Sequence, residues 1–463
     1  MTFTELRFIW FLLIVFGLHW SIPSHRWRKV MLLASSYLFY GAWDERFLLL
    51  IALSTVVDYC VGIGLSRTEK RTKRNALLAA SLTVNLGLLG VFKYFNFFTE
   101  SGAAFLGWLG FNVSPYTVNL ILPVGISFYT FKTLSYTIDV WRQKAEPTRD
   151  FFDYALFVSF FPQLLAGPIT RARDFLFQLD ESRHFDEVPF RAALTLFLFG
   201  FIKKACIADN VAVVVDAIFA APGEYSAAGL WLGAVLYFIQ IYADFSGYSD
   251  MAIATAALFG YKLPLNFFFP IWARSITDFW RRWHISLSSW FRDYLYIPLG
   301  GNRKGNFNTY RNLWLVFFLC GLWHGPAWTF VLWGTIHGLV LVIERIFRLH
   351  KLLQATPLGW LWAFPIATFA WVFFRMPEIG EAFTYIQGML GLGEGTQIAA
   401  DWIRWVGVCA LFYAFHGINL LARIDQKLEK LPRLVFAVFI GAAFALALPF
   451  VATTYKPFIY FQF

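Results

Sequence analysis

Apolar stretches long enough to cross a membrane recur along this sequence, and no other feature restricts its fold as strongly. Since hydrocarbon offers the backbone no hydrogen-bond partner, such stretches fold as helices whose peptide groups bond internally. Two shorter apolar runs, 30–43 and 251–261, indicate broken, tilted or re-entrant elements. We therefore expect an all-α polytopic membrane protein with roughly ten to twelve membrane-embedded helices. The stretches that approach the ~20 residues of a full span are 8–22, 47–65, 76–92, 154–170, 225–243, 352–374, 405–422 and 434–455.

The sequence between these stretches indicates a single domain. With 58% hydrophobic and only 15% charged residues, the chain lies well outside the range of soluble globular proteins. No long linker, charge run or low-complexity tract divides it, and no internal repeat suggests a transporter built from two halves. We expect one integral membrane domain over residues 1–463, with the first apolar stretch retained as a helix rather than cleaved as a signal peptide.

The distribution of the basic residues indicates the membrane topology. The net charge of +10 could suggest nucleic acid, but the lysines and arginines fall in short loops between apolar stretches. Loops 23–29 and 66–74 are both basic, and the two apolar segments between them can form a hairpin that leaves both loops in the cytoplasm. This arrangement predicts an N-terminus outside the cytoplasm, membrane lipid as the surrounding partner and no nucleic-acid ligand.

Most familiar catalytic motifs are absent from the sequence. The sequence contains no phosphate-binding loop, no dinucleotide-binding glycine pattern, no serine nucleophile elbow and no H-E-x-x-H zinc motif. The four cysteines stand in or beside apolar stretches without C-x-x-C spacing, which favours core packing. We therefore expect no metal site and no permanently bound cofactor.

His324 occupies an unusual position within run 312–343, which contains no Asp, Glu, Lys or Arg. If both flanks of this run are cytoplasmic, the chain must enter the membrane and return, and the "HGP" triplet is the natural turning point. His324 would then lie ~18 Å into a hydrocarbon core of ~30 Å, lined by Trp323, Trp328 and Trp333. An ionisable group at that depth marks a functional site unless it only satisfies a carbonyl at a helix break. His337 fits the second interpretation better.

The stretch 273–303 has the pattern of an amphipathic helix with His284 at the rim of its apolar face. One interpretation is an interfacial helix whose arginines meet lipid phosphate. The other is a roof over a cavity, whose basic edge receives a phosphate-bearing donor. The apolar face comprises Ile276, Phe279, Trp280, Trp283, Leu287, Trp290 and Phe291. One polar edge comprises Thr277, Arg281, Ser288 and Arg292, and the other comprises Asp278, Arg282, Ser289 and Asp293.

Two aspartates flank Gly247 in the otherwise apolar stretch 240–254. Asp244 and Asp250 could form a proton or cation path in a transporter. They could also hold an interrupted helix together, and we favour this structural role.

Six segments of the sequence form a recognisable set, which includes the stretches around His324, His284 and Asp244. They are "LPVGISFYTFKTLSYTIDVWR" (122–142), "FVSFFPQLLAGPITR" (157–171), "IYADFSGYSDMA" (241–252), "ITDFWRRWHISLSSWFRDYLYIPLGGNR" (276–303), "GLWHGPAWTFVLWGTIHG" (321–338) and "PFIYFQF" (457–463). Together they resemble the membrane-bound O-acyltransferase (MBOAT) family, and within it the bacterial branch that O-acetylates alginate. The resemblance implies a ring of tilted, partly broken and re-entrant helices around a thin centre with a tunnel. It also implies acyl transfer from a cytoplasmic thioester to a hydroxyl beyond the membrane.

By this resemblance, His324 corresponds to the catalytic histidine of the family and His284 to its second active-site histidine. His324 would act as general base on the acceptor hydroxyl. His284 would donate a hydrogen bond to the developing oxyanion or orient the donor. A thiol intermediate on Cys320, one helical turn before His324, is a less favoured alternative. No cofactor-binding residue is identified, and the side chains expected to bind substrate are Trp323, Trp328, Asp278, Arg281, Arg282, Ser288 and Arg292.

The expected donor is acetyl-CoA, and the expected acceptor is an extracytoplasmic polysaccharide such as alginate. Transfer would be completed by a periplasmic acetyltransferase partner at the bacterial inner membrane. Three alternatives stay open. The protein could transfer D-alanine from a carrier protein to teichoic acid, act as a proton-coupled polysaccharide or lipid transporter through Asp244, Asp250 and His324, or serve as a noncatalytic scaffold of a secretion complex.

Overall fold

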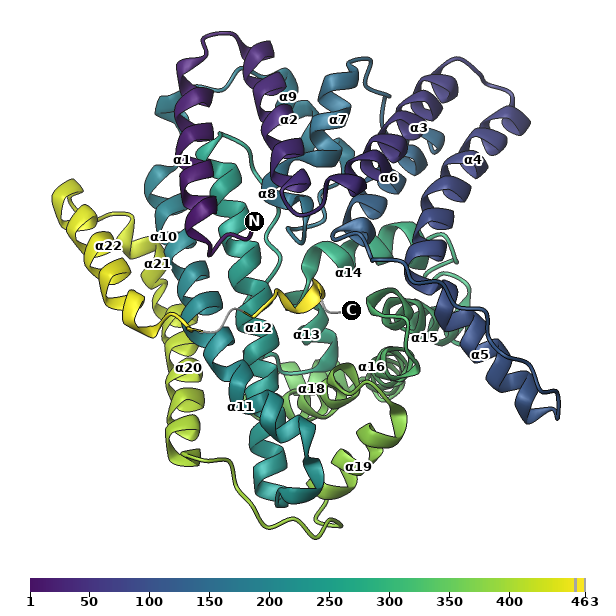
Figure 1. Ribbon diagram of the computed structural model, residues 1–463, viewed down its shortest axis with the longest axis vertical. Coiled ribbons are helices and arrows are strands. Elements are labelled where there is room, and N and C mark those ends of the chain that lie inside the picture. The colour runs from purple at the N-terminus through teal and green to yellow at the C-terminus, as the bar shows by residue number, and fades with distance from the viewer. Residues whose placement is uncertain (454–455, 462–463) are drawn as a thin grey trace. The chain divides into compact units, whose positions relative to one another are not determined.

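The computed structural model describes residues 1–453 and 456–461, and the regular secondary structure of this part of the chain is helical (Figure 1). Extended pairing among these residues is limited to a single parallel bridge between Tyr225 and Gln397. Seven helical segments of the described chain are long and apolar enough to cross a membrane. The prediction of an all-α polytopic membrane protein is therefore confirmed.

The backbone divides into two compact units, which are residues 1–190 with 252–264 and residues 191–251 with 265–463. The expected single domain over 1–463 stays a prediction. The helices of the first unit are α1 (Leu6–Ser21), α2 (His25–Gly41), α3 (Leu48–Ser66), α4 (Arg71–Leu89), α5 (Phe95–Trp108), α6 (Ile126–Trp141), α7 (Phe151–Ser159), α8 (Phe161–Leu164) and α9 (Ala172–Asp180).

A buried carboxylate joins three helices of the first unit, α3, α4 and α6, which pack side by side (Figure 1). Asp58 of α3 accepts hydrogen bonds from Ser81 and Asn85 of α4 and from Thr137 of α6. Because a buried carboxylate needs such donors, the cluster ties the three helices together inside an apolar environment.

The expected span 154–170 is broken in the structure. Helix α7 ends at Ser159, and α8 is a short helix with Pro162 in its first turn. Proline lacks the N–H that would continue the α7 ladder, so the chain turns here. Breaks of this kind explain why seven segments of the described chain have the length of a span, fewer than the expected ten to twelve membrane-embedded helices.

The helices of the second unit position the site described below. They are α10 (Phe190–Phe201), the π-helical turn η4 (Ile202–Ala208), α11 (Asp209–Ala220), α12 (Ala227–Leu258), α13 (Ile276–Arg282), α14 (Ile285–Phe291), α15 (Gly305–His324), α16 (Trp328–Ile346), α17 (Leu349–Gln354), α18 (Trp360–Arg375), α19 (Ile379–Met389), α20 (Trp402–Ala422), α21 (Ile424–Leu428) and α22 (Arg433–Ala447). Helix α12 continues past residue 251 into the first unit.

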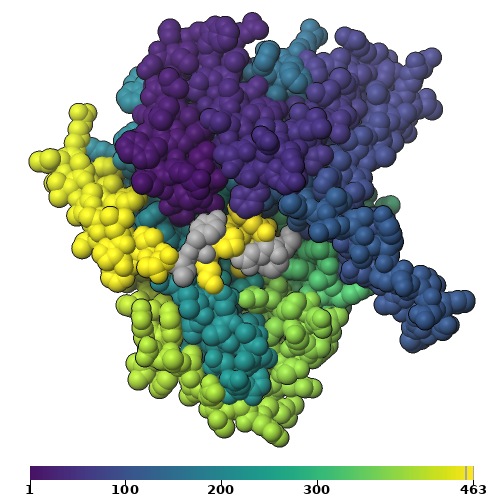
Figure 2. Space-filling view, viewed as in Figure 1, coloured from purple at the N-terminus to yellow at the C-terminus, as the bar shows by residue number. Residues whose placement is uncertain are grey.

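Helix α22, yellow in Figure 2, presents much of its apolar surface outward. Leu434, Val438 and Leu446 are all exposed. An apolar helix with so little of its surface covered by protein has the character of a lipid-facing segment, because exposed leucines and valines would be costly in water.

Helix α12 is continuous, so the expected interruption at Gly247 is wrong. The glycine serves instead for close helix packing, since a Cβ at Gly247 would lie 2.6 Å from the carbonyl oxygen of Gly200 in α10. The two flanking aspartates form ion pairs with η4, Asp244 with Lys204 at 2.7 Å and Asp250 with Lys203. These pairs support the structural role over a proton path.

Helices α15 and α16 form a hairpin whose connection is residues 325–327, which confirms the predicted break after His324. The two helices approach closely at two glycines. A Cβ at Gly334 would overlap the carbonyl oxygen of Phe317 and lie 2.9 Å from the Cα of Gly321. Such small-residue contacts are the usual means by which membrane helices approach one another closely.

Candidate active site

His284 lies at a break between two short helices, so the continuous amphipathic helix expected over 273–303 is wrong. Helix α13 ends at Arg282, Trp283 is extended, and His284 has the left-handed backbone angles φ 43° and ψ 53° before α14 begins. Non-glycine residues in this region cost of order 1–3 kcal/mol and concentrate at functional sites.

Backbone hydrogen bonds from a neighbouring loop stabilise this break. The N–H of Ile285 donates to the carbonyl of Asn266 at 2.9 Å, and the N–H of Phe268 donates to the carbonyl of Arg282 at 2.9 Å. The expected apolar face is nevertheless buried at all seven positions. His284 is completely buried rather than at the rim of that face, because the break turns its ring inward.

Asn266 fixes the tautomer of His284. Its Oδ1 accepts hydrogen bonds from the backbone N–H of Ser286 at 3.3 Å and from the Ser286 hydroxyl at 2.8 Å. Since a backbone N–H can only donate, this atom is the amide oxygen, and the contact at 3.1 Å with His284 must be donated by Nδ1–H. Burial lowers the pKa of His284 to about 3, so the ring is neutral and its Nε2 carries a lone pair.

His324 is buried at the last residue of α15, inside a shell of aromatic rings. Its ring centroid lies 4.8 Å from that of Trp323, 4.9 Å from Trp333 on α16 and 5.2 Å from Phe374 on α18. Trp328, which was also predicted to line this histidine, is instead 52% exposed at the first residue of α16. Three helices therefore enclose the imidazole.

Two aromatic rings lie between the histidines. The Trp323 centroid is 6.3 Å from His284 and 4.8 Å from His324. The Tyr460 centroid is 6.4 Å from His284 and 5.6 Å from His324. Residues 284 and 324 come from different parts of the chain, and the fold brings them within one ring of each other.

Tyr460 was not among the predicted site residues. It belongs to the short turn Ile459–Phe461 near the end of the chain. The terminal segment 457–463 contributed to the family resemblance. Its high aromatic content was the sequence feature that could have identified Tyr460 as a site residue. No periodicity or spacing placed it beside the histidines, because the contact spans more than 130 residues of sequence. Residues 462 and 463 of that segment lie outside the described residues.

The other predicted substrate-binding side chains lie on α13, on α14 and at the end of α14. Asp278 accepts from the Nε–H of Arg282 at 2.9 Å, and Arg292 pairs with Asp293 at 2.7 Å. The hydroxyl of Ser288 donates to the carbonyl of Trp283 at 3.4 Å and so helps to hold the break. Arg281 is exposed. The structure therefore shows local pairing for Arg282 and Arg292.

His337 and Cys320 are also buried near this region. The Nδ1 of His337 accepts a hydrogen bond from the indole N–H of Trp280 at 3.3 Å, and its ring stacks at 6.1 Å on Phe279. His337 lies inside the continuous helix α16 and accepts from an indole, so it does not satisfy a carbonyl at a helix break as predicted, and its purely structural role stays a prediction. Cys320 lies one turn before His324 on α15.

Glu344, a second residue that sequence analysis missed, anchors the start of α13. Its carboxylate accepts from the backbone N–H groups of Ile276 and Thr277 at 2.6 and 2.9 Å. It also accepts from the Thr277 hydroxyl at 2.7 Å and from the Trp362 indole at 3.0 Å. A carboxylate at a helix N-terminus satisfies free N–H groups and favours the helix dipole. Helix α13, which leads to His284, is thereby held to α16, which follows His324.

The sequence comparisons agree with this architecture. Residues 38–377 match the model of the membrane-bound O-acyltransferase family. The chain is 38% identical to the probable alginate O-acetylase AlgI of Pseudomonas putida and 39% identical to that of Azotobacter vinelandii, each over the full length of both proteins. It is also 39% identical to the peptidoglycan O-acetyltransferase of Helicobacter pylori, over 79% of this chain and 74% of that protein. The chain is a multi-pass membrane O-acyltransferase and belongs to the membrane-bound O-acyltransferase family.

Proposed function

We propose that this protein transfers an acetyl group from cytoplasmic acetyl-CoA across the membrane for O-acetylation of an extracytoplasmic polysaccharide such as alginate. The observation that carries the proposal is the pair of buried histidines, His284 and His324, joined by the rings of Trp323 and Tyr460. The relatives include two probable alginate O-acetylases and a peptidoglycan O-acetyltransferase, and these names support acetyl as the acyl group.

In the proposed reaction His324 acts as general base. The acceptor hydroxyl attacks the thioester carbonyl carbon while His324 takes its proton. The C–S bond then breaks, and the proton passes from the imidazolium to the departing sulfur. The aromatic shell around His324 supports this role because it excludes water that would hydrolyse the thioester.

The tautomer of His284 argues against one of its two expected roles. A neutral ring whose Nδ1–H donates to Asn266 has only the Nε2 lone pair to offer on its other side. It can accept a hydrogen bond but cannot donate one to an oxyanion. We therefore infer that His284 orients a substrate by accepting a hydrogen bond, whereas oxyanion stabilisation comes from other donors.

In this proposal, arginines near His284 bind the phosphates of the acetyl-CoA donor, and a periplasmic protein completes the transfer. Arg281 is exposed, and Arg282 and Arg292 keep donors beyond those paired with Asp278 and Asp293. Arginine guanidinium groups suit phosphate recognition at the mouth of a donor tunnel. We place the protein in the bacterial inner membrane as one acyltransferase domain over 1–463, acting with a periplasmic acetyltransferase that completes transfer to the polysaccharide.

Measurement of CoA release by the purified protein in lipid tests this proposal. Acetyl-CoA consumption coupled to labelled acetyl on the polysaccharide, in the presence of the partner fraction, is the expected result. Consumption of a D-alanyl carrier thioester instead would indicate the teichoic acid alternative. Polysaccharide or lipid transport without thioester consumption would indicate a transporter, and complex assembly without either activity would indicate a scaffold.

Substitution Asn266→Asp is expected to change the pH dependence of acetyl transfer. The carboxylate keeps the acceptor for His284 Nδ1–H, but its negative charge favours the imidazolium and raises the His284 pKa above its value of about 3. If the neutral ring is the active form, activity is lost as pH falls through this raised pKa. The acidic limb of kcat/KM therefore moves to higher pH.

The matched control is Ser286→Ala, which removes another donor to Asn266 without adding charge. It should leave the acidic limb in place even if it lowers stability. An unchanged acidic limb in Asn266→Asp would contradict the role assigned to neutral His284.

A further inference from the structure

The C-terminal segment, defined here as residues 456–461, brings Tyr460 to both histidines although it has little regular structure of its own. Its helical content is the single turn Ile459–Phe461. A short segment of this kind does not hold its position through internal hydrogen bonds. Contacts with the rest of the second unit must therefore determine where the Tyr460 ring lies.

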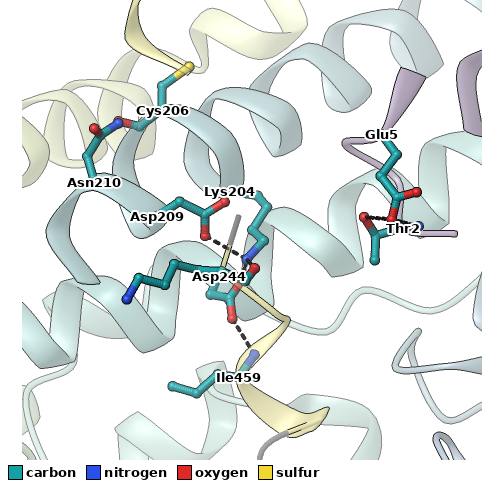
Figure 3. Close-up of polar contacts among 9 residues, drawn as sticks. Thr2, Glu5, Lys204, Cys206, Asp209, Asn210, Asp244 and Ile459 are labelled. Atoms are coloured by element: carbon teal, nitrogen blue, oxygen red, sulfur yellow. Dashed lines mark hydrogen bonds and ion pairs between the residues drawn. The ribbon is translucent and has the colours of Figure 1, made fainter. Parts of the chain in front are cut away.

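Asp244 supplies the central contact (Figure 3). Its Oδ2 accepts a hydrogen bond at 2.7 Å from the backbone N–H of Ile459, the residue directly before Tyr460. Its Oδ1 pairs at 2.7 Å with the Nζ of Lys204 on η4. Lys204 Nζ also donates to the carbonyl oxygen of Lys456 at 3.3 Å. One aspartate and one lysine thus hold the backbone of the segment at two points.

These two side chains are among the most buried charges of the unit. The side chain of Lys204 is 6% exposed and that of Asp244 is 5% exposed. Charges removed from water in this way persist only when they are paired and hydrogen-bonded. A second carboxylate, Asp209, pairs with Lys204 at 2.7 Å on its other side, so the lysine has a fixed position between two carboxylates.

A second group of charges fixes the start of the segment. Lys456 pairs with Asp216 at 2.7 Å, and Arg375 of α18 pairs with the same carboxylate at 2.9 Å. Together with Lys204, Asp209 and Asp244 they line a polar cavity of about 210 Å³ whose wall includes Pro457 and Ile459. Three positive and three negative side chains surround it, so the cluster carries no net charge.

The aromatic side chains of the segment pack in the same place. Phe458 lies 4.7 Å from the ring of Tyr248 and 5.7 Å from that of Phe245, both on α12. Tyr460 lies 4.5 Å from Phe245, which in turn lies 4.7 Å from His284. The charged contacts and the aromatic contacts therefore both act on this one short stretch of backbone.

We propose that Asp244, oriented by Lys204, is a positioning residue of this acyltransferase. It holds the C-terminal segment through the N–H of Ile459 and so keeps Tyr460 between His284 and His324. This inference rests on the proposed function, in which His284 and His324 take part in acetyl transfer. Loss of the contact displaces the Tyr460 ring and slows acetyl transfer without changing the donor-binding surface.

Substitution Ile459→Pro removes the backbone N–H that donates to Asp244. Proline is tolerated at the first residue of a helical turn, so the turn itself is preserved. We expect kcat for CoA release to fall roughly tenfold to hundredfold. This factor corresponds to the free energy that a hydrogen bond to a charged group contributes. The KM for acetyl-CoA should stay unchanged, and amide hydrogen exchange at 456–461 should become faster. Ile459→Val keeps the N–H and should retain both wild-type values.

Combined variants test whether the effect passes through Tyr460. Tyr460→Ala alone should lower kcat by a similar factor, and adding it to Ile459→Pro should cause little further loss, because the ring is already displaced. Fully additive losses would overturn the proposal. Unchanged exchange at 456–461 in Ile459→Pro would show that Asp244 does not hold the segment, and faster exchange with wild-type kcat would show that its position does not matter for transfer.

This experiment separates the inference from the proposed function. A wild-type protein that releases no CoA would overturn the proposed function by itself. The hydrogen exchange comparison needs no substrate, so it decides independently whether the Asp244 contact holds the segment.

Discussion

His324→Gln is expected to lower CoA release from acetyl-CoA by about a hundredfold or more, because general base catalysis typically contributes 10²–10⁴-fold. Glutamine can fill much of the space inside the aromatic shell but cannot take a proton from the acceptor hydroxyl. The fold should therefore be retained while the chemical step is lost. The measurement is kcat for CoA release at equal amounts of folded protein, judged by size-exclusion profile and Tm in lipid.

His337→Gln is the matched control for this variant. Residue 337 is also a buried histidine, and a glutamine oxygen can replace its acceptor for the Trp280 indole. It should keep wild-type turnover with at most a small fall in Tm. Wild-type turnover in His324→Gln would contradict the assignment of the base, and Cys320 and His284 would then be the next residues to test.

Gly334→Ala is expected to have the largest effect on folding. A Cβ at this position would overlap the carbonyl oxygen of Phe317, and it would lie 2.9 Å from both the Cα and the N of Gly321. All of these are backbone atoms, so no side-chain rotation can relieve the overlap and α15 and α16 must move apart. Overpacking costs roughly 1–3 kcal/mol even where side chains can adjust. We expect a loss of about 3 kcal/mol or more, with little folded protein recovered.

The thermal unfolding midpoint in lipid and the yield of monodisperse protein measure this loss. Gly407→Ala on α20 is the matched control, since nothing lies within 4 Å of a Cβ built there. Alanine is the better helix former, so this control should keep or slightly raise Tm. A Gly334→Ala protein with wild-type Tm would show that the hairpin can open without cost and that its close approach is not required.

Several parts of the site were predictable because they depend on local sequence. The break after His324 follows from Gly325, which is a weak helix former, and from Pro326, which lacks the N–H that would continue the helix, and the structure ends α15 at His324. The burial of the aromatic face between Ile276 and Phe291 follows from side-chain type. The carbonyl at a helix break that was expected for His337 was not predictable in this way, because its actual partner, the Trp280 indole, is 57 residues away in sequence.

Other expectations failed where a distant segment changed the local conformation. Periodicity favoured one helix through 273–303, but backbone bonds with Asn266 and Phe268 stabilise a break at His284 that no helical pattern reveals. Trp328 was expected to line His324 because it is near in sequence, yet it begins α16 with its side chain largely exposed. Gly247 suggested an interrupted helix, whereas its actual role is contact with Gly200 of another helix.

The sequence by itself therefore determined the membrane environment, the helical class, the family and one histidine at a helix break. These properties follow from apolar length, residue type and local backbone preference, which act over a few residues. Only the tertiary structure decided that Asn266 fixes the tautomer of His284, that Glu344 anchors α13 and that the end of the chain places Tyr460 between the two histidines. Each of these contacts joins residues 18 to 176 positions apart, and the chain must fold before such groups can meet.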